Sequence, residues 1–487
     1  MTQHSSKSDK VIKMQIVDFY TENMVYKNEE NSDSDESVED FNSKFQLDES
    51  KYKIMLFGKD EFDKTYSVLV DEFTPYFYLK MPDTFTKDKI KYLEVWLKEN
   101  MWNKHEDGLL RITLHKKMSF RGFTNKKKFN FVRLVFQNTN AMNNCINLFQ
   151  NKTWNPVTKK ISKILPKKVN ITGITGKPEI FDLYENMIDP MIRFIHHREI
   201  KPVGWISISK YKIRDFEHPT NCNVNIVTRW TDINYLENEN NVGIKIMAYD
   251  IECDSSHGDF PLPIKDYLKL TREIVLEYER IQKNLITKDV NQLELEKYQY
   301  INKNKKGFIK KLLTAAFNNG DEEFNISRVY IKEGYNKPKE EIINNVSGKI
   351  LNYIIDYDPT LKTLDRSKII EKSIDNINNK ILNRFFPPVE GDKTIQIGTS
   401  FIKYGESKPY RNVMYTLGTC DKIENTETIS FKTEKELLLE FRKLIIEEDP
   451  EVITGYNING FDTPWLMKRA QELDIEEFCK LSRLNDY

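Results

Sequence analysis

Residues 245–253 read Lys-Ile-Met-Ala-Tyr-Asp-Ile-Glu-Cys, a short apolar run that carries two acidic side chains. The apolar residues predict a mostly buried β-strand. Asp250 and Glu252 stand at positions i and i+2, so their side chains leave the same face of the strand, about 6.6 Å apart along it. Carboxylates in such a strand are costly to bury unless metal ions or a Lys or Arg side chain neutralise them. The sequence leaves both alternatives open.

The elements that follow this strand predict an α/β unit. Their order is strand, strand, helix, strand, helix, and the first two strands pair around a turn at 405–409. The first helix begins at a capping-box pattern and places five apolar residues on one face, which are Leu437, Leu438, Phe441, Leu444 and Ile445. The predicted elements are strands at 393–404, 412–420 and 452–456, a helix from Thr433-Glu-Lys-Glu436 to Asp449-Pro450, and a helix near Thr463-Pro464.

Asp462 stands just before the second predicted helix. Its side chain could cap that helix, since an acceptor there satisfies free backbone N–H groups and suits the helix dipole. It could instead project toward Asp250 and Glu252 if the strand at 452–456 lies beside the strand that carries them. Both alternatives remain open.

The rest of the chain differs from this unit in composition and in the pattern of its apolar residues. Residues 28–40 are rich in acids and serines and cannot bury enough apolar surface to fold, so we expect residues 1–48 to form a disordered acidic tail. Short apolar runs from Lys53 onward predict a β-rich N-terminal domain over 49–240. Apolar residues at helical spacing predict a helical insertion over 265–384, and they are Tyr267, Leu270, Ile274, Tyr278, Ile281 and Leu285.

Residues 101–170 are strongly basic, with 15 Lys or Arg and two acids, a net charge of +13. Phenylalanines are interleaved with these charges. The mixture suits a phosphate backbone with bases stacked beside it, and Lys126, Lys127 and Lys128 are then candidate DNA contacts. The alternative, which a charge run alone favours, is a solvated basic face over a core of Phe. The phenylalanines are Phe120, Phe123, Phe129, Phe131 and Phe136.

Composition narrows the class of protein. The 487 residues suggest about three domains, and 74 Lys plus Arg balance 74 Asp plus Glu, so the overall charge does not indicate a partner. No apolar run is long enough for a membrane span, and no apolar signal core opens the chain. Five scattered cysteines without a Cys-x-x-Cys spacing indicate reduced thiols, no zinc site and an intracellular protein.

Two motifs carry a resemblance to family B DNA polymerases. Asp250-Ile-Glu252, followed by Phe260-Pro261, resembles the first exonuclease motif of that family, and Gly455-Tyr-Asn-Ile-Asn-Gly-Phe-Asp-Thr-Pro464 resembles the second. Upstream, Phe73-Thr-Pro-Tyr-Phe77 and the segment 184–206 resemble the N-terminal domain of the replicative, delta-like members, which occur in eukaryotes and large DNA viruses. The resemblance covers about residues 50–264 and 385–487.

The resemblance implies an α/β, ribonuclease H-like 3′→5′ proofreading exonuclease domain over 241–264 and 385–487, behind a β-rich α+β N-terminal domain. It implies that Asp250, Glu252 and Asp462 are catalytic ligands of two divalent metal ions, Mg²⁺ or, in substitution, Mn²⁺. It implies further that the single-stranded 3′ end of a primer–template meets Asn457, Tyr456 and Phe461.

The sequence also departs from the family. A Tyr-x-x-x-Asp third exonuclease motif does not follow the second, and the palm signatures Asp-x-x-Ser-Leu-Tyr-Pro-Ser and Asp-Thr-Asp are absent from the 487 residues. We therefore expect an N-terminal polymerase portion, ending by truncation, gene splitting or an interrupted frame, that needs a downstream polymerase portion or partner chain. A sliding clamp is a further candidate partner, and the site of action would be the nucleus or a viral replication site. Two alternatives are a non-catalytic single-stranded-DNA-binding subunit and a free-standing 3′→5′ exonuclease.

Overall fold

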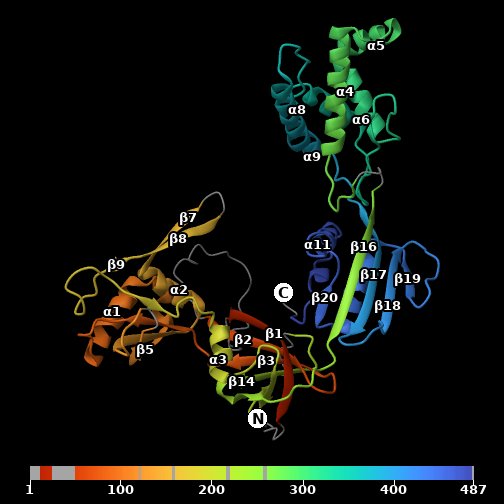
Figure 1. Ribbon diagram of the computed structural model, residues 1–487. Coiled ribbons are helices and arrows are strands. Elements are labelled where there is room, and N and C mark those ends of the chain that lie inside the picture. The colour runs from red at the N-terminus through yellow and green to blue at the C-terminus, as the bar shows by residue number, and fades with distance from the viewer. Residues whose placement is uncertain are drawn as a thin grey trace, which may run out of the picture. The chain divides into compact units, whose positions relative to one another are not determined.

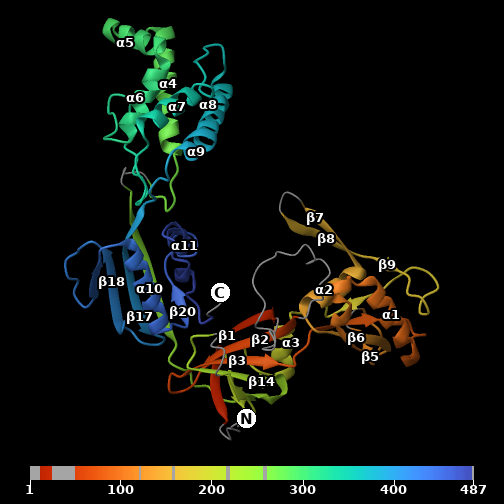
Figure 2. The same cartoon turned by 180° about the vertical axis from the view of Figure 1, so that it is seen from behind.

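The structure, a computed structural model, describes residues 11–24, 50–119, 122–155, 159–214, 220–255 and 260–484. The chain divides into two compact units, the first reaching Gly243 and the second starting at Ile244 (Figures 1 and 2). Residues 483 and 484 belong to the first unit. Each unit packs around its own apolar clusters.

A seven-stranded sheet is the first layer of unit 1, in the order β13-β14-β3-β2-β1-β12-β15. The central strands β2 and β3 bury apolar residues on both faces. Ile54 and Val68 join Met14 in the larger cluster, and the alternate residues Met55, Phe57 and Leu69 form a smaller one. Helix α3 (Pro190–Arg198) starts at the N-cap Asp189, whose carboxylate accepts from the Met191 N–H. The strands are β1 (Ile12–Met24), β2 (Lys51–Lys59), β3 (Thr65–Asp71), β12 (Trp205–Ile208), β13 (Lys212–Ile213), β14 (Val224–Arg229) and β15 (Ile233–Leu236).

Strand β1 corrects the expectation of a disordered tail over residues 1–48. It pairs antiparallel with β2 over nine residues and with β12 over four. Its apolar residues Met14 and Ile16 are completely buried in this sheet, so tertiary packing orders a segment whose neighbours in sequence are polar. The acidic stretch 28–40 lies outside the described residues.

The basic segment 101–170 contributes β5, β6 and α2 to a second sheet of unit 1, which has the order β11-β4-β6-β5 and also packs with α1. Phe131 and Phe136 are buried there, so they are core residues and not base-stacking side chains, whereas Phe123 is 96% exposed. Phe120 lies outside the described residues. The elements are β4 (Tyr76–Lys80), α1 (Ile90–Asn100), β5 (Leu109–Met118), β6 (Lys128–Phe136), α2 (Thr139–Leu148) and β11 (Leu183–Tyr184).

Two small antiparallel pairs complete unit 1. Strands β9 (Lys168–Val169) and β10 (Glu179–Ile180) form a short pair. Strands β7 (Gln150–Asn155) and β8 (Lys160–Pro166) form a two-stranded ribbon, which extends away from the neighbouring sheet in Figures 1 and 2.

A five-stranded sheet organises unit 2, in the order β19-β18-β17-β16-β20. The predicted strands at 245–253, 393–404, 412–420 and 452–456 are confirmed, and β17 and β18 form the expected antiparallel pair. Strand β19 was not predicted. All its residues are exposed or half-buried, so it has no buried apolar face of the kind by which a strand is recognised in a sequence. The strands are β16 (Lys245–Asp254), β17 (Lys393–Lys403), β18 (Arg411–Leu417), β19 (Glu427–Phe431) and β20 (Val452–Thr454).

Two helices pack on one face of this sheet. The capping box at Thr433 and Glu436 is present, and α10 (Glu434–Glu448) buries the five predicted apolar residues. Helix α11 (Asp462–Glu472) adds Trp465 and Leu466 to the same core as Met247, Tyr249 and Ile251 of β16. The intervening residues Asp250 and Glu252 point to the other face of β16 and are exposed, which corrects the expectation of a mostly buried strand.

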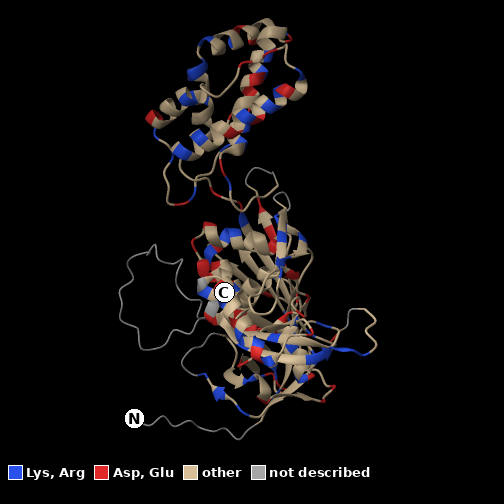
Figure 3. Cartoon of the chain, turned by 90° about the vertical axis from the view of Figure 1, so that its left-hand side faces the viewer, with Lys and Arg blue, Asp and Glu red and all other residues tan. Residues whose placement is uncertain are grey.

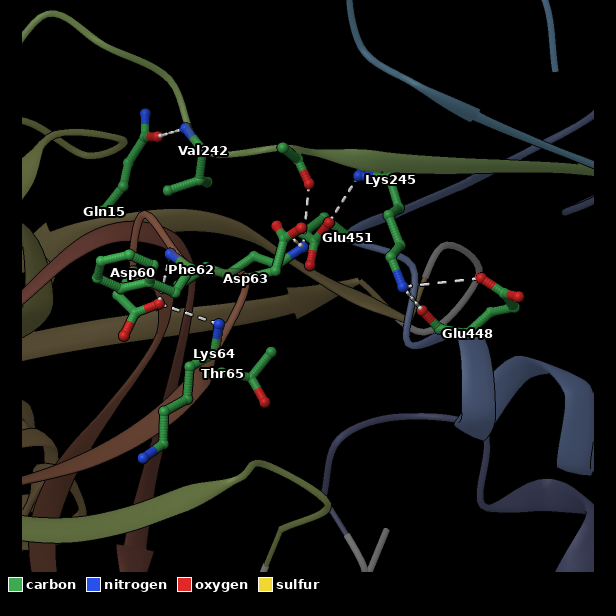
Figure 4. A network of polar contacts seen from close by, with 12 residues as sticks. Gln15, Asp60, Phe62, Asp63, Lys64, Thr65, Val242, Lys245, Glu448 and Glu451 are labelled. Atoms are coloured by element: carbon green, nitrogen blue, oxygen red, sulfur yellow. Dashed lines mark hydrogen bonds and ion pairs between the residues drawn. The ribbon is translucent and has the colours of Figure 1, made fainter. Parts of the chain in front are cut away.

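The first residue of β16 is held by α10 and by the chain that follows it. The Lys245 ammonium group donates to the Glu448 carbonyl oxygen at 2.8 Å and lies 3.7 Å from its carboxylate. Its backbone N–H donates to the Glu451 carboxylate at 2.7 Å (Figure 4). These contacts fix the start of β16 beside the start of β20.

The segment between β16 and β17 is helical, as predicted, and has a core of its own. Tyr267, Leu270, Ile274, Tyr278 and Ile281 are buried in it. Lys and Arg are interspersed with Asp and Glu over its helices (Figure 3). The helices are α4 (Leu268–Thr287), α5 (Gln292–Lys303), α6 (Lys305–Ala316), α7 (Glu340–Ile350), α8 (Thr363–Ile377), a π-helical turn (Asn378–Leu382) and α9 (Asn383–Phe385).

Two general expectations can be checked on the described residues. Their helices include none with the length and apolar character needed to cross a membrane. The five cysteines, all of which lie in the described ranges, have free thiols.

Candidate active site

The carboxyl ends of two parallel strands define the site. Strand β16 pairs in parallel with β20, with Ala248 opposite Thr454. Asp250 and Glu252 continue β16 beyond this pair, and the loop 455–461 continues the chain beyond β20. Because parallel strands end at the same edge of a sheet, the loop and the two acids share that edge.

Asp462 connects the loop to β16. Its side chain is 2% exposed, and its Oδ1 atom accepts a hydrogen bond from the Ile251 backbone N–H at 3.2 Å. Helix α11 has no side-chain cap, so the capping role considered for Asp462 is not the one that the structure adopts. The side chain reaches instead the backbone of β16 at Ile251, next to Asp250.

Asp462 and Asp250 form a pair of like charges. Burial raises the pKa of Asp462 above its usual range, backbone N–H groups of Asp462 and Ile251 oppose the rise, and the neighbouring Asp250 charge adds to it. Burial also raises the pKa of the Cys253 thiol to about 12, with further contributions from the charges of Glu434, Asp462 and Glu252. The end of β16 is therefore a region of negative potential.

Glu252 shares the face of Asp250 but does not join the pair. No group of three His, Cys, Asp or Glu side chains is arranged as a metal site in the described ranges. Among the same residues, neither Asp250 nor Glu252 forms an ion pair with Lys or Arg, so the cationic alternative considered from the sequence is not observed there. The oxygen donors fit hard divalent cations, which prefer such ligands, and the structure brings two of the three together.

The loop before Asp462 follows a tight path. A Cβ atom on Gly455 would lie 2.5 Å from the Tyr249 carbonyl oxygen, so only glycine fits beside β16 there. Asn457 has a φ of 55°, and its carbonyl oxygen accepts from the Gly460 and Phe461 N–H groups at 2.8 and 3.0 Å. The Tyr249 hydroxyl lies 2.6 Å from the Thr463 hydroxyl oxygen. This loop positions Asp462 through backbone geometry.

Three side chains of the loop region face solvent to different degrees. Tyr456 is 93% exposed, Asn457 is exposed, and Phe461 is half-buried. The Phe461 ring packs 5.6 Å from Trp465 and 6.0 Å from the exposed ring of Phe260. Phe260 was quoted as part of the first motif but not as a site residue, and its proximity to Phe461 could not be read from a separation of about 200 positions.

Comparison with known proteins identifies the family of this chain. The model of the DNA polymerase family B exonuclease domain matches residues 181–268 and 335–487. The DNA polymerase of Pyramimonas orientalis virus is 33% identical over 442 residues, which cover 88% of this chain and 35% of that protein. The chain belongs to DNA polymerase family B. It spans about a third of the length of this viral relative.

Two further comparisons concern other branches of family B. The DNA polymerase delta catalytic subunit of Arabidopsis thaliana is 46% identical over 102 residues, which cover 21% of this chain and 9% of that protein. The family B DNA polymerase of Pyrobaculum calidifontis matches 95% of this chain and 33% of its own with a TM-score of 0.44 and 11% identity. The delta-like resemblance of the motifs thus has a counterpart in a eukaryotic relative.

A buried ion pair beneath this family B site was not found from the sequence. The Arg469 guanidinium donates to the Glu434 carboxylate through Nε at 3.0 Å, and both side chains are 2% exposed. Glu434 also accepts from the Thr394 N–H at 2.8 Å, and Arg469 donates to the Pro263 carbonyl oxygen at 2.8 Å. The pair therefore joins α10, α11, β17 and the chain before the insertion.

The like-charge pair predicts a stability change. Replacing Asp250 by Asn should raise the free energy of unfolding of unit 2 by about 1 kcal/mol or less at neutral pH in EDTA, because one exposed charge of the pair is removed. An acid whose pKa is raised by folding destabilises the fold above that pKa, so the gain should vanish in acid, where Asp462 is protonated. Urea denaturation at both pH values measures it.

Glu252→Gln is the matched control for this prediction. Glu252 lies on the same exposed face, but its carboxylate is not among the main causes of the raised pKa of Asp462. Glu252→Gln should therefore change the free energy of unfolding less than Asp250→Asn does. A loss of stability in Asp250→Asn under EDTA would show that the two carboxylates do not repel each other in the folded chain.

Proposed function

We propose that this chain is the DNA-guiding and proofreading portion of a family B DNA polymerase, acting in DNA replication as a 3′→5′ exonuclease. The observation that carries the proposal is the hydrogen bond from the Ile251 N–H to Asp462, which brings acids 212 positions apart to the end of β16. Anionic side chains are gathered there without a protein cation among the described residues. Such an arrangement is typical of sites that bind metal ions.

Asp250, Glu252 and Asp462 would hold two divalent cations, Mg²⁺ or Mn²⁺. When bound, these ions lower the pKa of a water molecule and neutralise charge during attack on a phosphodiester. The chain's own contribution is to fix Asp462 through the Ile251 N–H and to leave Asp250 and Glu252 open on one face of β16. Closing the set of three then needs Glu252 to turn toward the other two acids.

The loop residues would bind the single-stranded 3′ end of the DNA. Asn457 is exposed and would hold the terminal nucleotide, while Phe461 and Tyr456 offer aromatic rings to its bases. Stacking is worth about 1–3 kcal/mol per base and does not depend on base identity. A mismatched end unpairs more readily, so the cost of unpairing can select the substrate without base-specific contacts.

The remaining functions of a whole polymerase are proposed to lie outside this chain. Nucleotide addition would come from a downstream polymerase portion or a partner chain, which would also supply the Tyr-x-x-x-Asp motif. A sliding clamp is a candidate partner of the assembly. We propose a viral replication site or the nucleus as the site of action, and the similarity to a viral and a eukaryotic DNA polymerase supports this proposal.

A second function is favoured by one observation. Since Glu252 does not close a group of three with Asp250 and Asp462, the chain by itself could bind single strands without cleaving them. A single experiment separates the alternatives. The chain is incubated with 3′-labelled single-stranded DNA and Mg²⁺, alone and after mixing with a family B polypeptide that carries the Tyr-x-x-x-Asp motif.

Each outcome of this experiment has one meaning. Release of labelled nucleotides only after mixing supports the proofreading portion. Release by the chain alone indicates a free-standing exonuclease. Binding without release under both conditions overturns the proposed activity and leaves a non-catalytic binding subunit.

The basic segment yields a prediction for DNA binding. Lys126, Lys127 and Lys128 are exposed, but Lys127 pairs with Asp83 at 3.0 Å. Replacing all three by Gln should weaken DNA binding similarly across sequences and reduce the slope of log K against log salt by about two rather than three. Titrations at several salt concentrations measure this slope. An unchanged slope would mean that these three lysines do not contact DNA and belong to a solvated basic face.

A further inference from the structure

The β7–β8 ribbon is exposed along almost its whole length. All residues of β8 are exposed, as are the four central residues of β7. The base is well anchored, because the Lys167 N–H donates to the carbonyl oxygen of the buried Phe149 at 2.9 Å. An isolated two-stranded ribbon is marginally stable in water. The side chains of the ribbon therefore do not serve to build a core.

The ribbon is strongly and uniformly basic. Residues 150–168 contain six Lys and no Asp or Glu, in a chain whose charges otherwise balance. In the described residues, none of these six lysines forms an ion pair with an acid, whereas Lys98 and Lys127 elsewhere in unit 1 do. Acids in the described part of the chain therefore do not neutralise their positive charge.

The pairing of the two strands distributes side chains over both faces. Trp154 lies opposite Ile161 and Lys152 opposite Ile164, so these four share one face. Thr153 lies opposite Lys163 and Asn155 opposite Lys160, which puts these lysines on the other face. Trp154 is 58% exposed, and Ile161 and Ile164 are also exposed. The ribbon thus carries cations on both faces and an open apolar stripe on one.

We propose that the β7–β8 ribbon binds double-stranded DNA by entering a groove, with Lys152, Lys160 and Lys163 facing phosphates and Trp154 in apolar contact with the groove. The major groove is about 12 Å wide and admits a two-stranded ribbon. Cations on both faces match a groove, which has a phosphate backbone on each side, better than a single strand. The inference rests on the proposed function only in taking DNA as the ligand.

The test compares duplex and single-stranded DNA bound by the full chain. Lys152→Gln/Lys160→Gln/Lys163→Gln should lower duplex affinity by at least about 10-fold at moderate salt and reduce the salt slope by about three. The same triple variant should lose less affinity for single-stranded DNA. Trp154→Ala should weaken duplex binding without changing the slope. Fluorescence anisotropy of labelled DNA at several salt concentrations measures all three effects.

The matched control removes the same charge elsewhere. Lys288→Gln/Lys303→Gln/Lys306→Gln changes three exposed lysines of the insertion and should leave duplex affinity nearly unchanged. Unchanged duplex affinity in the ribbon variant would overturn the proposal and favour an acidic protein as partner. An equal loss for single strands would overturn the choice of duplex. Release of nucleotides from a 3′-labelled single strand is measured apart from these titrations, so failure of the proposed nuclease is distinguished from failure of duplex binding by the ribbon.

Discussion

Replacing Arg469 by Met should lower the free energy of unfolding of unit 2 by about 3–5 kcal/mol. The change removes the partner of the Glu434 carboxylate, which is 2% exposed and lies in the core between α10 and α11. Leaving a carboxylate buried without its cation costs far more free energy than the ion pair contributes to stability, because the buried group cannot regain its hydration. The Thr394 N–H would still donate a hydrogen bond to Glu434.

Hydrogen exchange of peptides from α11 and β17 across a urea series measures this loss in the full chain. Glu434→Leu combined with Arg469→Met is the matched control, since it removes both charges and should lose less than the single change. Lys443→Met, an exposed change on α10, should have almost no effect. A loss below about 1 kcal/mol in Arg469→Met would show that the pair does not hold α11 against the sheet.

Local signals made much of unit 2 predictable. The capping box at Thr433 and Glu436 fixed the start of α10, and the spacing of its apolar residues fixed the buried face. Alternation and turn residues identified β16, β17 and β18. Such signals act between residues a few positions apart, so one sequence contains them completely.

The features that could not be predicted depend on contacts between residues far apart in the sequence. Strand β1 is ordered by β2 and β12, and its sequence neighbours are polar. For Phe131 and Phe136, which stand among lysines, the sequence left base stacking and a buried core both open, and sheet alternation places them in the core. The Glu434–Arg469 pair joins residues 35 positions apart that carry no recognisable motif.

The acidic site combines both kinds of information. Spacing alone showed that Asp250 and Glu252 share a face of one strand. The position of Asp462 depended on β20 lying beside β16, which only the fold provides. The exposure of Asp250 and Glu252 was the opposite of the expectation for a mostly buried strand, because this face of β16 is not covered by α10 and α11.

Replacing Asp462 by Asn should reduce release of nucleotides from a 3′ end by about 100-fold or more in the mixture with the polypeptide that supplies the third motif. Changes to groups that only support metal ligands already cost about 10–100-fold, and Asp462 is proposed as a ligand itself. Asn keeps the size of the side chain and an oxygen acceptor for the Ile251 N–H, so the fold should persist. Removal of divalent ions with EDTA should have the same effect on the wild type.

Binding of Mn²⁺ to the chain alone separates loss of the metal site from loss of DNA binding. Isothermal titration should show weaker binding for Asp462→Asn and for Asp250→Ala/Glu252→Ala, whereas Asp254→Ala, an exposed acid at the end of the same strand, should bind like the wild type. Identical Mn²⁺ binding by the wild type and the double variant would refute the ligand assignment. The hydrogen bond to Ile251 would then only fasten α11 to β16, since a carboxylate can hold two elements together without binding a metal ion.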